Sequence, residues 1–326
     1  MRAVVLTEYG GVEVLRITDV PSPEPGPDEV LVDVVATALN RADLLQRMGM
    51  YPGPPMEFEI PGMEFAGRVA AVGRRVTGVE LGRPVMGIVG GGAYAEQLVT
   101  HERLLMDVPS GLALEDAVAV PEVFITAFDA LVAQGGLTAG RVALVHAGAS
   151  GVGTAALQIC RAIGAQVVAT ASADKLDACR SLGATVAVDR RDEDFVDAVQ
   201  QLTGGRGADV ILDVVGGDYV DRNIDAVAVD GRIIQVGVMA GVKAEVNVSK
   251  LLMKRATLRG TTLRSRAIEE KIAITRRVAT EVLPFFETGA LRPVIDRRYP
   301  FDQVADAHTY MASNASIGKI VLDVAS

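Results

Sequence analysis

The chain has 326 residues, a formal net charge of −9 at pH 7 and 49% hydrophobic residues. This length predicts two domains, and the acidic balance argues against nucleic-acid binding, which relies on basic patches. The sequence has no apolar run of about twenty residues that would predict a membrane span, and no signal-peptide layout at its start. Its only cysteines, Cys160 and Cys179, cannot build a disulfide framework. We therefore expect a cytoplasmic protein with no nucleic-acid or membrane partner.

Residues 1 to about 120 have the pattern of a β-rich domain. Short apolar runs recur at Ala3–Leu6, Val30–Val35, Phe65–Val72 and Val85–Val89, and the segments PSPEPGPDE, PGPP and GGG interrupt the sequence around them. Clusters of proline and glycine between apolar runs are typical of turns. We predict a small barrel-like domain.

From about Val123 to Thr262, apolar strands alternate with helical patterns such as Thr154–Ile163 and Lys175–Leu182. Strands joined by crossover helices predict a doubly wound parallel sheet. The six predicted strands are Val142–His146, Gln166–Ala171, Val186–Val188, Val210–Val214, Arg232–Val236 and Thr257–Gly260.

The C-terminal region begins with an amphipathic segment, Ile268–Glu287, and ends with a helical pattern and an apolar strand. The final helix and strand have no role in a nucleotide-binding sheet, so we expect the region to return to the first domain and leave a ligand cleft between the domains. The predicted α/β protein has one domain from residues 1–122 and 267–326 and a second from residues 123–266.

A glycine-rich turn, GASGVG, lies between the first predicted strand of the sheet and a helix. Glycines allow a tight turn and let a diphosphate approach the backbone amides, and a helix N-terminus favours an anion. This context predicts a dinucleotide site, held by Gly148, Ser150, Gly151, Val152 and Gly153. A tight strand-to-helix turn without a ligand is the alternative.

The end of the second strand indicates which dinucleotide binds. NAD sites usually carry an acidic residue there for the ribose 2′-hydroxyl, but Ala171 and Ser172 occupy the position here. Lys175 and Arg190 follow, and such cations pair with a 2′-phosphate. We therefore predict NADPH, with Ser172, Lys175 and Arg190 near that phosphate. Asp174 argues against this assignment, and solvated surface charges are the alternative for the cations.

Several stretches together carry a resemblance to a known family. They are ALNRADLLQRMGMYPGPP, PGMEFAG, PEVFITAFDAL, GRVALVHAGASGVGTAALQICRAIGA, LRSR and the ending NASIGKIVLDV. In order and spacing they resemble the zinc-independent quinone oxidoreductases of the medium-chain dehydrogenase/reductase superfamily, nearest to the tumour-suppressor-inducible enzymes and more distantly zeta-crystallin. The resemblance implies a GroES-like catalytic domain, a Rossmann domain, NADPH, quinone reduction biased to one-electron steps, and homodimers or homotetramers.

The chain departs from the zinc-dependent members of that superfamily, which carry a cysteine and a His-Glu pair in the first domain. Here Asn40 stands near the cysteine position and Met63 replaces the histidine. The two cysteines cannot form a four-thiolate site, and His101, His146 and His308 are scattered along the chain. We predict no metal. Alcohol oxidation then lacks the Lewis acid that would polarise an alkoxide.

The resemblance also implies residues near the substrate. Asn40, Asp43 and Arg47 share one helix face at spacing i, i+3, i+7; Asn40 is expected to hydrogen-bond near the nicotinamide and the substrate, and Asp43 to pair with Arg47. Tyr51 is a candidate lid over a quinone, with loop packing as the alternative. Ser150 is a candidate to face the cofactor phosphate or the substrate carbonyl, with helix capping as the alternative.

Further cofactor contacts are predicted at the ends of other elements. Thr126 is expected against the nicotinamide, and Gly216 and Gly237 follow the fourth and fifth strands, at the edge where such sheets bind ligands. Arg264 and Lys319 are candidates for the cofactor phosphates or ribose, and a surface ion pair is the alternative for Lys319.

The leading interpretation is an NADPH-dependent quinone reductase, because a quinone mainly needs stacking against the nicotinamide in a water-poor site. Reduction of α,β-unsaturated carbonyls or enoyl thioesters is an alternative that requires a positioned acid such as Tyr51. A non-catalytic structural or RNA-binding role, as for zeta-crystallin relatives, is a third interpretation. The acidic charge and the intact nucleotide glycines argue against it.

Overall fold

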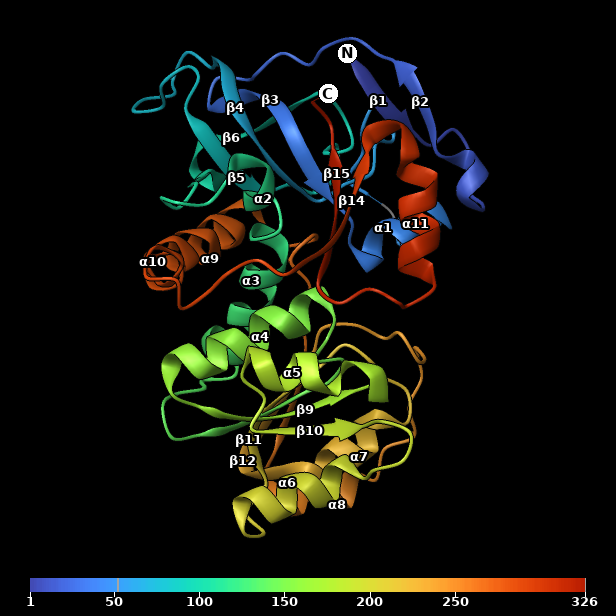
Figure 1. Ribbon diagram of the computed structural model, residues 1–326, viewed down its shortest axis with the longest axis vertical. Helices are drawn as coiled ribbons and strands as arrows, with labels where there is room; N and C mark the ends of the chain where they lie inside the picture. Colours follow the sequence, from blue (N-terminus) through green and yellow to red (C-terminus); the bar gives the residue numbers. More distant parts are fainter. Residues whose placement is uncertain (52, 326) are drawn as a thin grey trace. The chain divides into compact units, whose positions relative to one another are not determined.

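The computed structural model describes residues 1–51 and 53–325, which form two compact units (Figure 1). The first unit joins Met1–Glu122 to Arg264–Ser326, and the second unit is Val123–Leu263. The C-terminal region therefore belongs to the first unit. The second unit ends at Leu263, whereas the sequence pattern predicted a boundary after residue 266.

The first unit is built on a seven-stranded, mostly antiparallel sheet. Its strand order is β14-β15-β3-β4-β5-β7, and β6 pairs with β3 outside this path. The strands are β3 (Glu29–Ala38), β4 (Glu64–Val72), β5 (Pro84–Ile88), β6 (Gln97–His101), β7 (Met106–Asp107), β14 (Ile295–Pro300) and β15 (Lys319–Asp323). A separate antiparallel pair consists of β1 (Arg2–Val5) and β2 (Arg16–Asp19).

The alternation in β3, EVLVDVVATA, explains its position inside the sheet. Val30, Val32 and Val34 are at most 4% exposed and belong to the same hydrophobic core as Phe65 of β4, while Asp33 is exposed. Successive side chains of a strand point to opposite faces, so the three valines share the buried face.

The pairing of β15 with β3 brings the C-terminal strand beside the residues that follow β3. The register is antiparallel and pairs Val321 with Ala38, and the Leu39 N–H donates to the Ile320 carbonyl at 2.9 Å. Because numbering runs in opposite directions along two antiparallel strands, Lys319 comes to lie opposite Asn40. Residues 279 positions apart in the chain thus meet beside this sheet.

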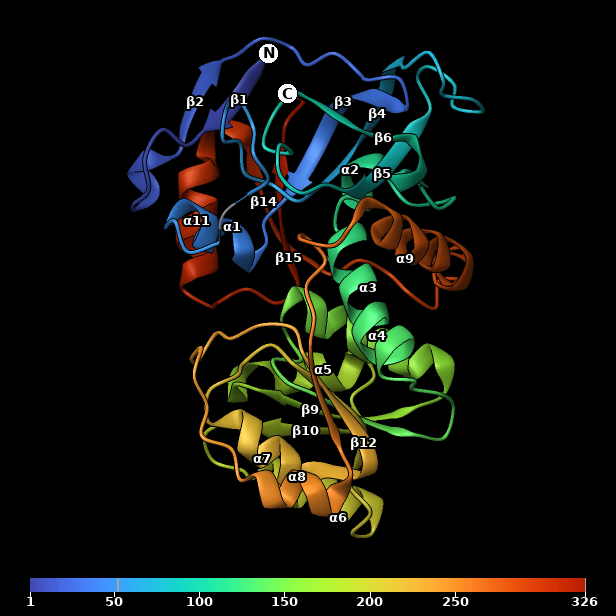
Figure 2. The ribbon, with the colours of Figure 1, turned by 180° about the vertical axis from the view of Figure 1, so that it is seen from behind.

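Five α-helices lie wholly within the described residues of the first unit: α1 (Arg41–Arg47), α2 (Leu114–Ala117), α9 (Ile268–Glu281), α10 (Pro284–Glu287) and α11 (Val304–Ala312). Helices α1 and α11 lie side by side (Figures 1 and 2). The predicted amphipathic segment is two helices rather than one, because Pro284 cannot continue α9 and instead occupies the first turn of α10.

The second unit is a six-stranded parallel sheet with the order β10-β9-β8-β11-β12-β13. The strands are β8 (Val142–Val145), β9 (Gln166–Ala171), β10 (Val186–Asp189), β11 (Ala208–Asp213), β12 (Val227–Gln235) and β13 (Thr257–Gly260). The order reverses direction at β8, which is the arrangement of a doubly wound nucleotide-binding sheet. The predicted sheet is confirmed, with β9 and β13 at the predicted residues.

Helices cover both faces of this sheet. Helices α4 and α5 pack on one face, and α6, α7 and α8 on the other (Figure 1). Their bounds are α4 (Gly151–Ile163), α5 (Leu176–Leu182), α6 (Phe195–Thr203), α7 (Tyr219–Ala226) and α8 (Val248–Lys254), and α3 (Pro121–Phe128) precedes them. Every residue of β8 is buried, as expected for a parallel strand covered on both sides.

None of the helices in residues 1–51 and 53–325 is long and apolar enough to cross a membrane.

Candidate functional site

The glycine-rich turn of the second unit joins β8 to the N-terminus of α4. Ser150 caps this helix, because its Oγ accepts a hydrogen bond from the Gly153 N–H at 3.0 Å. Ala147 adopts a left-handed backbone conformation with φ of 53°. The alternative role proposed for Ser150, helix capping, is therefore present in the structure.

At two positions of this turn, neighbouring atoms lie so close to the backbone that only glycine fits. A Cβ at Gly153 would lie 2.2 Å from the Ala147 carbonyl oxygen, and a Cβ at Gly148 would lie 3.0 Å from the Ala169 Cβ and 3.2 Å from the Cys179 Sγ. Gly153 thus lets α4 start close against the turn, and Gly148 lets the turn pack against β9 and α5. Any larger residue at Gly153 would push α4 away from the turn.

The turn fits the diphosphate of a dinucleotide. In the described part of the chain, the first-turn amides of Gly151 and Val152 have no hydrogen-bond acceptor, as expected at a helix N-terminus. Two unpaired N–H groups and the positive end of the helix dipole favour an anion. The structure thus brings Gly148, Ser150, Gly151, Val152 and Gly153 together at one turn.

The adjacent end of β9 carries the residues predicted to choose the dinucleotide. Arg190 follows β10, and its N–H donates to the Ala171 carbonyl at 2.9 Å, so Arg190 and Ser172 lie at the same edge of the sheet. The Arg190 side chain is exposed. A hydrogen bond from Ser172 is the main reason that the pKa of Asp174 is held below its ordinary value.

Lys175 is not a solvated surface charge, which was the alternative to its predicted role. Its side chain is only 8% exposed. Burial raises the pKa of the Cys179 thiol to about 11, and the Lys175 ammonium is near enough to act against this rise. Lys175 therefore packs toward α5, and its role as a phosphate ligand stays a prediction.

Glycines also mark the ends of β11 and β12. Gly216 has φ of 67°, and its N–H donates to the buried Asp213 Oδ1 at 3.0 Å. A Cβ at Gly237 would lie 3.0 Å from the Val214 carbonyl oxygen. Both glycines sit at the carboxyl edge of the sheet, as predicted from their place after the strands. Thr126 lies in α3 and is 9% exposed.

The first unit contains a buried polar group of three residues, which we call the Asn40–Glu64–Lys319 cluster. The Lys319 Nζ donates to the Leu39 carbonyl at 2.6 Å and Asn40 Oδ1 at 2.8 Å, and lies 2.6 Å from Glu64 Oε1. The Asn40 Nδ2 donates to the same Glu64 oxygen at 2.9 Å. The side chains of Lys319 and Glu64 are 3% and 0% exposed.

These bonds contradict the prediction that Lys319 contacts the cofactor. They also restrict the hydrogen bonds that Asn40 can make to a cofactor or substrate. An ammonium has three donors, and all three of Lys319 are used inside the first unit, so none remains for a cofactor. The Asn40 Nδ2 also donates to the Ala38 carbonyl at 3.3 Å, which occupies both hydrogens of the amide. Further ligands of Asn40 are therefore restricted to its oxygen.

The predicted ion pair between Asp43 and Arg47 is wrong. Asp43 Oδ2 instead accepts hydrogen bonds from the Asn40 N–H at 2.7 Å and the Tyr94 hydroxyl at 3.1 Å. No ion pair joins Asp43 to Arg47 among the described residues, and Arg47 Nε and Nη1 are buried without a partner. Burial raises the pKa of Asp43 to about 6 despite these donors.

Arg264 holds the segment that contains Tyr51. Its guanidinium donates to the Gly90 carbonyl at 2.6 Å, the Tyr51 carbonyl at 3.2 Å and Gln46 Oε1 at 2.6 Å. The Arg264 Cζ also lies 5.1 Å from the centre of the Tyr51 ring, within range of a cation–π contact. Arg264 thus belongs to the first unit and positions the predicted lid residue.

Glu122 is a titratable residue that the sequence interpretation missed. Its backbone N–H donates to Glu64 Oε2 at 2.9 Å. Burial, and then the charge of Glu64, raise the pKa of Glu122 to about 8. A glutamate inside the apolar stretch VAVPEVFITAF was the available signal.

Comparison with known proteins finds a family for each of two parts of the chain. Residues 26–110 match the alcohol dehydrogenase GroES-like domain family, and residues 151–279 match the zinc-binding dehydrogenase family. The synaptic vesicle membrane protein VAT-1 homolog of Rattus norvegicus is 31% identical over 339 residues, covering 99% of this chain and 84% of that protein. The quinone oxidoreductase of Lama guanicoe is 33% identical over 327 residues, covering 99% of this chain and 97% of that protein.

The chain belongs to the medium-chain dehydrogenase/reductase superfamily, in its quinone oxidoreductase and VAT-1-like branch. The crystal structure of Escherichia coli quinone oxidoreductase complexed with NADPH is similar, with a TM-score of 0.90 and 26% identity over 99% of this chain and 100% of that one. The predicted GroES-like and Rossmann domains are thereby confirmed. The protein is an NAD(P)-dependent oxidoreductase of this superfamily.

The residues of this oxidoreductase do not fit the zinc named in one of the matching families. No group of three or more His, Cys, Asp or Glu side chains in residues 1–51 and 53–325 is arranged to hold a metal ion. Both cysteines are buried, and burial raises the pKa of Cys160 to about 12. Because zinc binds the thiolate form, neither thiol is suited to it.

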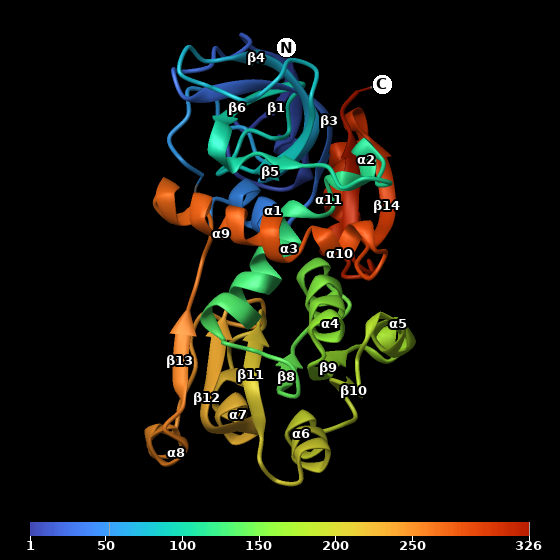
Figure 3. The same ribbon diagram turned by 90° about the vertical axis from the view of Figure 1, so that its left-hand side faces the viewer.

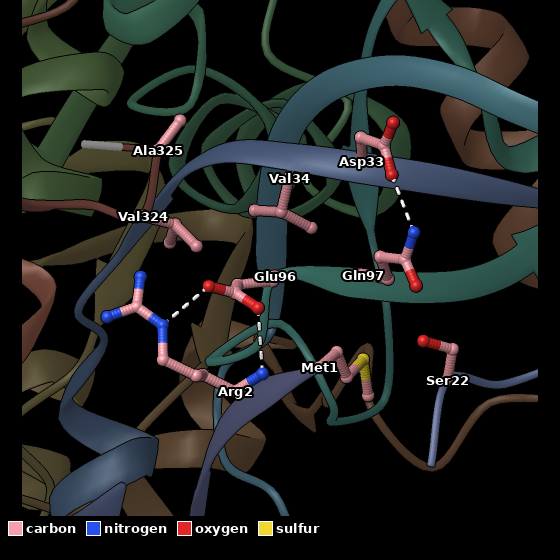
Figure 4. A pocket seen from close by; sticks show the side chains of 9 residues that line it. All are labelled: Met1, Arg2, Ser22, Asp33, Val34, Glu96, Gln97, Val324 and Ala325. Atoms are coloured by element: carbon pink, nitrogen blue, oxygen red, sulfur yellow. Dashed lines mark hydrogen bonds and ion pairs between the residues drawn. The ribbon is translucent and has the colours of Figure 1, made fainter. Parts of the chain in front are cut away.

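The oxidoreductase also has a hollow of about 530 Å³ in its first unit, shown in Figure 4. The Arg2 Nε lies 2.6 Å from Glu96 Oε1, and the Gln97 Nε2 donates to Asp33 Oδ1 at 2.8 Å within it. None of its lining residues is a predicted site residue. Its polar groups pair with one another, so we assign this hollow no part in the reaction.

Proposed function

We propose that this oxidoreductase is a zinc-independent, NADPH-dependent quinone reductase of the tumour-suppressor-inducible kind. The observation that carries the proposal is the Asn40–Glu64–Lys319 cluster, in which an amide and an ammonium occupy the surroundings of Glu64 instead of metal-binding groups. A site of this kind supports reduction of an acceptor that needs no Lewis acid, and a quinone is such an acceptor. Similarity to a protein named quinone oxidoreductase over nearly its full length supports the same class of substrate.

Bound NADPH supplies a hydride, and the residues of the chain bind and orient the two reactants. The amides of Gly151 and Val152 are suited to the diphosphate. Arg264 restrains Tyr51 through its carbonyl and ring, so that the flat Tyr51 side chain is suited to lie over a quinone. Ser150 is suited to the cofactor phosphate while it caps α4.

The preference for NADPH rests on Arg190 and Ser172. The exposed guanidinium of Arg190 and the small, uncharged side chain of Ser172 share one edge of the sheet, and the guanidinium is a donor for a 2′-phosphate. A carboxylate at the position of Ser172 would instead repel that phosphate. Asp174 is the opposing charge, and its hydrogen bond with Ser172 partly occupies it.

A coenzyme-oxidation screen tests the proposed function. The purified protein is given NADPH or NADH with ortho- and para-quinones, enals and enoyl thioesters, and oxidation is followed by absorbance. We expect turnover of quinones, a preference for NADPH of about tenfold or more, as one charge-assisted hydrogen bond supplies, and no loss of turnover with a chelator. Turnover of enals or enoyl thioesters alone would transfer the assignment to that class. Inactivity with every acceptor would refute the reductase assignment.

We also propose that the protein forms homodimers or homotetramers. The outer edge of β13 has no partner strand among the described residues, and apolar side chains of α8 next to it are exposed. An identical edge on a second copy is a natural partner for such a strand.

A further inference from the structure

His146 directly follows β8 and precedes the glycine-rich turn, and its ring is fully enclosed in the second unit. The residue is 0% exposed. The rings of Phe195 and Tyr219 each make a T-shaped contact with the imidazole, with ring centres 4.8 Å apart. An enclosed ring does not reach a bound ligand, so any effect of His146 on function is transmitted through its hydrogen bonds.

Four buried side chains form one line of hydrogen bonds through His146, which we call the Thr170–His146–Asn223–Asp213 chain. The His146 Nδ1 lies 3.1 Å from Thr170 Oγ1, and the His146 Nε2 lies 2.7 Å from Asn223 Oδ1. The Asn223 Nδ2 donates to Asp213 Oδ2 at 2.9 Å. All four residues are at most 1% exposed. The chain joins the ends of β9, β8 and β11 with α7.

Asp213 fixes the direction of every bond in this chain. Its two carboxylate oxygens are acceptors, so Asn223 presents its NH₂ group to Asp213 and its carbonyl oxygen to His146. His146 must then carry its proton on Nε2, which leaves Nδ1 to accept the hydroxyl proton of Thr170. A single neutral tautomer of His146 therefore satisfies the whole chain.

Both ends of the chain also hold backbone amides at the carboxyl edge of the sheet. At one end, Thr170 accepts the Ala147 N–H through its hydroxyl at 3.4 Å and the Gly148 N–H through its carbonyl at 2.8 Å. At the other end, Asp213 Oδ1 accepts the Gly216 N–H at 3.0 Å. The turns after β8 and β11 are thus connected through buried side chains, and this is the edge where such sheets bind ligands.

We infer that His146 is a positioning residue for the coenzyme: in its Nε2–H form it holds the turns after β8 and β11 in the arrangement that binds NADPH. The inference rests on the proposed assignment of the glycine-rich turn to the coenzyme diphosphate. Loss of the imidazole leaves Asn223 Oδ1 without a donor and the Thr170 hydroxyl without an acceptor. Buried polar groups without partners are costly, so the two turns are expected to shift until other partners are found.

Coenzyme binding tests this role. His146→Leu removes both ring nitrogens, and NADPH affinity in a fluorescence titration is expected to fall by about tenfold or more, the effect of leaving one buried polar group unpaired. The KM for NADPH is expected to rise while kcat at saturating NADPH stays unchanged, because His146 contacts neither reactant. His146→Gln can place an amide N–H near the position of Nε2, and it is expected to restore part of the affinity.

A variant at the opposite edge of the same sheet separates positioning from a general loss of stability. Val227 begins β12 and is 0% exposed. Its partner in the register is Ala208, the first residue of β11, so it lies at the amino edge of the sheet. Val227→Ala leaves a cavity in the core and is expected to lower the melting temperature without changing NADPH affinity.

Spectroscopy of the wild type measures the tautomer without any substitution. The chain has three histidines, His101, His146 and His308, so proton–nitrogen correlation NMR of the imidazoles gives few signals, and the variants assign the one from His146. Burial lowers the pKa of His146, and it outweighs the charge of Asp213, which favours the protonated ring, while Arg222 disfavours it. We therefore expect a neutral ring with its proton on Nε2 from about pH 5.5 to about pH 8.5.

The outcomes separate this inference from the function on which it rests. Unchanged NADPH affinity in His146→Leu, or an equal loss of affinity in Val227→Ala, would overturn the positioning role and leave the coenzyme assignment intact. A charged ring or a proton on Nδ1 in the wild type would do the same. His146→Gln takes the place of His146→Leu if the latter does not fold, and an affinity equal to that of the wild type would then overturn the role. A wild type that does not bind NADPH would overturn both the coenzyme assignment and the positioning role, whatever the tautomer.

Discussion

Lys319 and Glu64 form a buried ion pair whose surroundings decide whether it stabilises the fold. Removing two charges from water costs several kcal/mol per ion, and their attraction offsets this only when the remaining donors and acceptors are bonded. Here they are: the Leu39 carbonyl and Asn40 take the other Lys319 donors, and the Glu122 N–H bonds the second Glu64 oxygen. The pair is thus a fully bonded network, in which loss of one partner leaves a buried charge.

Removal of one charge from this network is expected to be more harmful than removal of both. Lys319→Met keeps an unbranched side chain, one atom shorter, but leaves Glu64 without a cation, and we expect a loss of about 3–5 kcal/mol in the free energy of unfolding. The double variant Lys319→Met/Glu64→Gln removes both charges and is expected to recover a large part of that loss. Chemical denaturation measures each value. A loss below about 1 kcal/mol in the single variant would show that the pair is not the buried, compensated network described here.

At the scale of elements, the strand-to-helix turn of the second unit depends on two residues with separate tasks. Ser150 supplies the cap of α4, and Gly153 allows the first turn of that helix to approach the Ala147 carbonyl. A lost cap affects the stability of the helix, whereas an added Cβ moves the amides that are suited to the diphosphate. Substitutions at Ser150 and Gly153 are therefore expected to have different effects.

Variants at these positions are expected to separate stability from coenzyme binding. Ser150→Ala is expected to lower the free energy of unfolding by about 1 kcal/mol, and Ser150→Thr, which retains a capping hydroxyl, is expected to restore most of it. Gly153→Ala is expected to weaken NADPH binding strongly, since its Cβ would lie 2.2 Å from a backbone oxygen. Thermal melting and fluorescence titration with NADPH measure the two effects. Unchanged NADPH affinity in Gly153→Ala would exclude this turn as the diphosphate site.

The elements that could be predicted are those that carry their own hydrophobic signal. Strand β8 is apolar throughout, and β9 and β11 have apolar centres; helices cover all three on both faces, so pattern and structure agree. Strand β14, with the sequence IDRRYP, has no fully buried residue; its place depends on pairing with β15, which local pattern does not reveal. The Asn40–Glu64–Lys319 cluster was missed for the same reason, because it requires the register of three strands from distant parts of the chain. Asn40 and Lys319 were recognised singly, but not as partners.

At the scale of the whole molecule, the first unit is completed by the end of the chain. Strand β15 lies between β14 and β3, and its residues Ile320, Val321 and Leu322 are fully buried. The same strand supplies the only cation in contact with Glu64 among the described residues. A domain assembled from both ends of the sequence therefore also assembles its charged cluster from both ends.

The second unit has an edge that favours contact with another copy. Strand β13 pairs only with β12 among the described strands, and Figure 3 shows it at the outer edge of the sheet with α8 near one end. Val248, Leu252 and Met253 of α8 are 61%, 71% and 79% exposed, and Leu258 of β13 is 40% exposed. An open strand edge beside exposed apolar side chains is the surface expected at an interface.

Self-association through this edge is expected to be visible in the mass of the particle. Two copies related by a twofold axis would pair their β13 strands antiparallel and cover the apolar residues of α8, so light scattering should give a multiple of the 34.2 kDa chain mass. The double variant Leu252→Lys/Leu258→Lys places like charges at the contact and is expected to reduce the mass toward 34.2 kDa. Val72→Lys, at an exposed apolar residue of the first unit, adds charge elsewhere and should leave the assembly intact. A monomeric wild type, or an assembly that withstands the double variant, would exclude this edge as the interface.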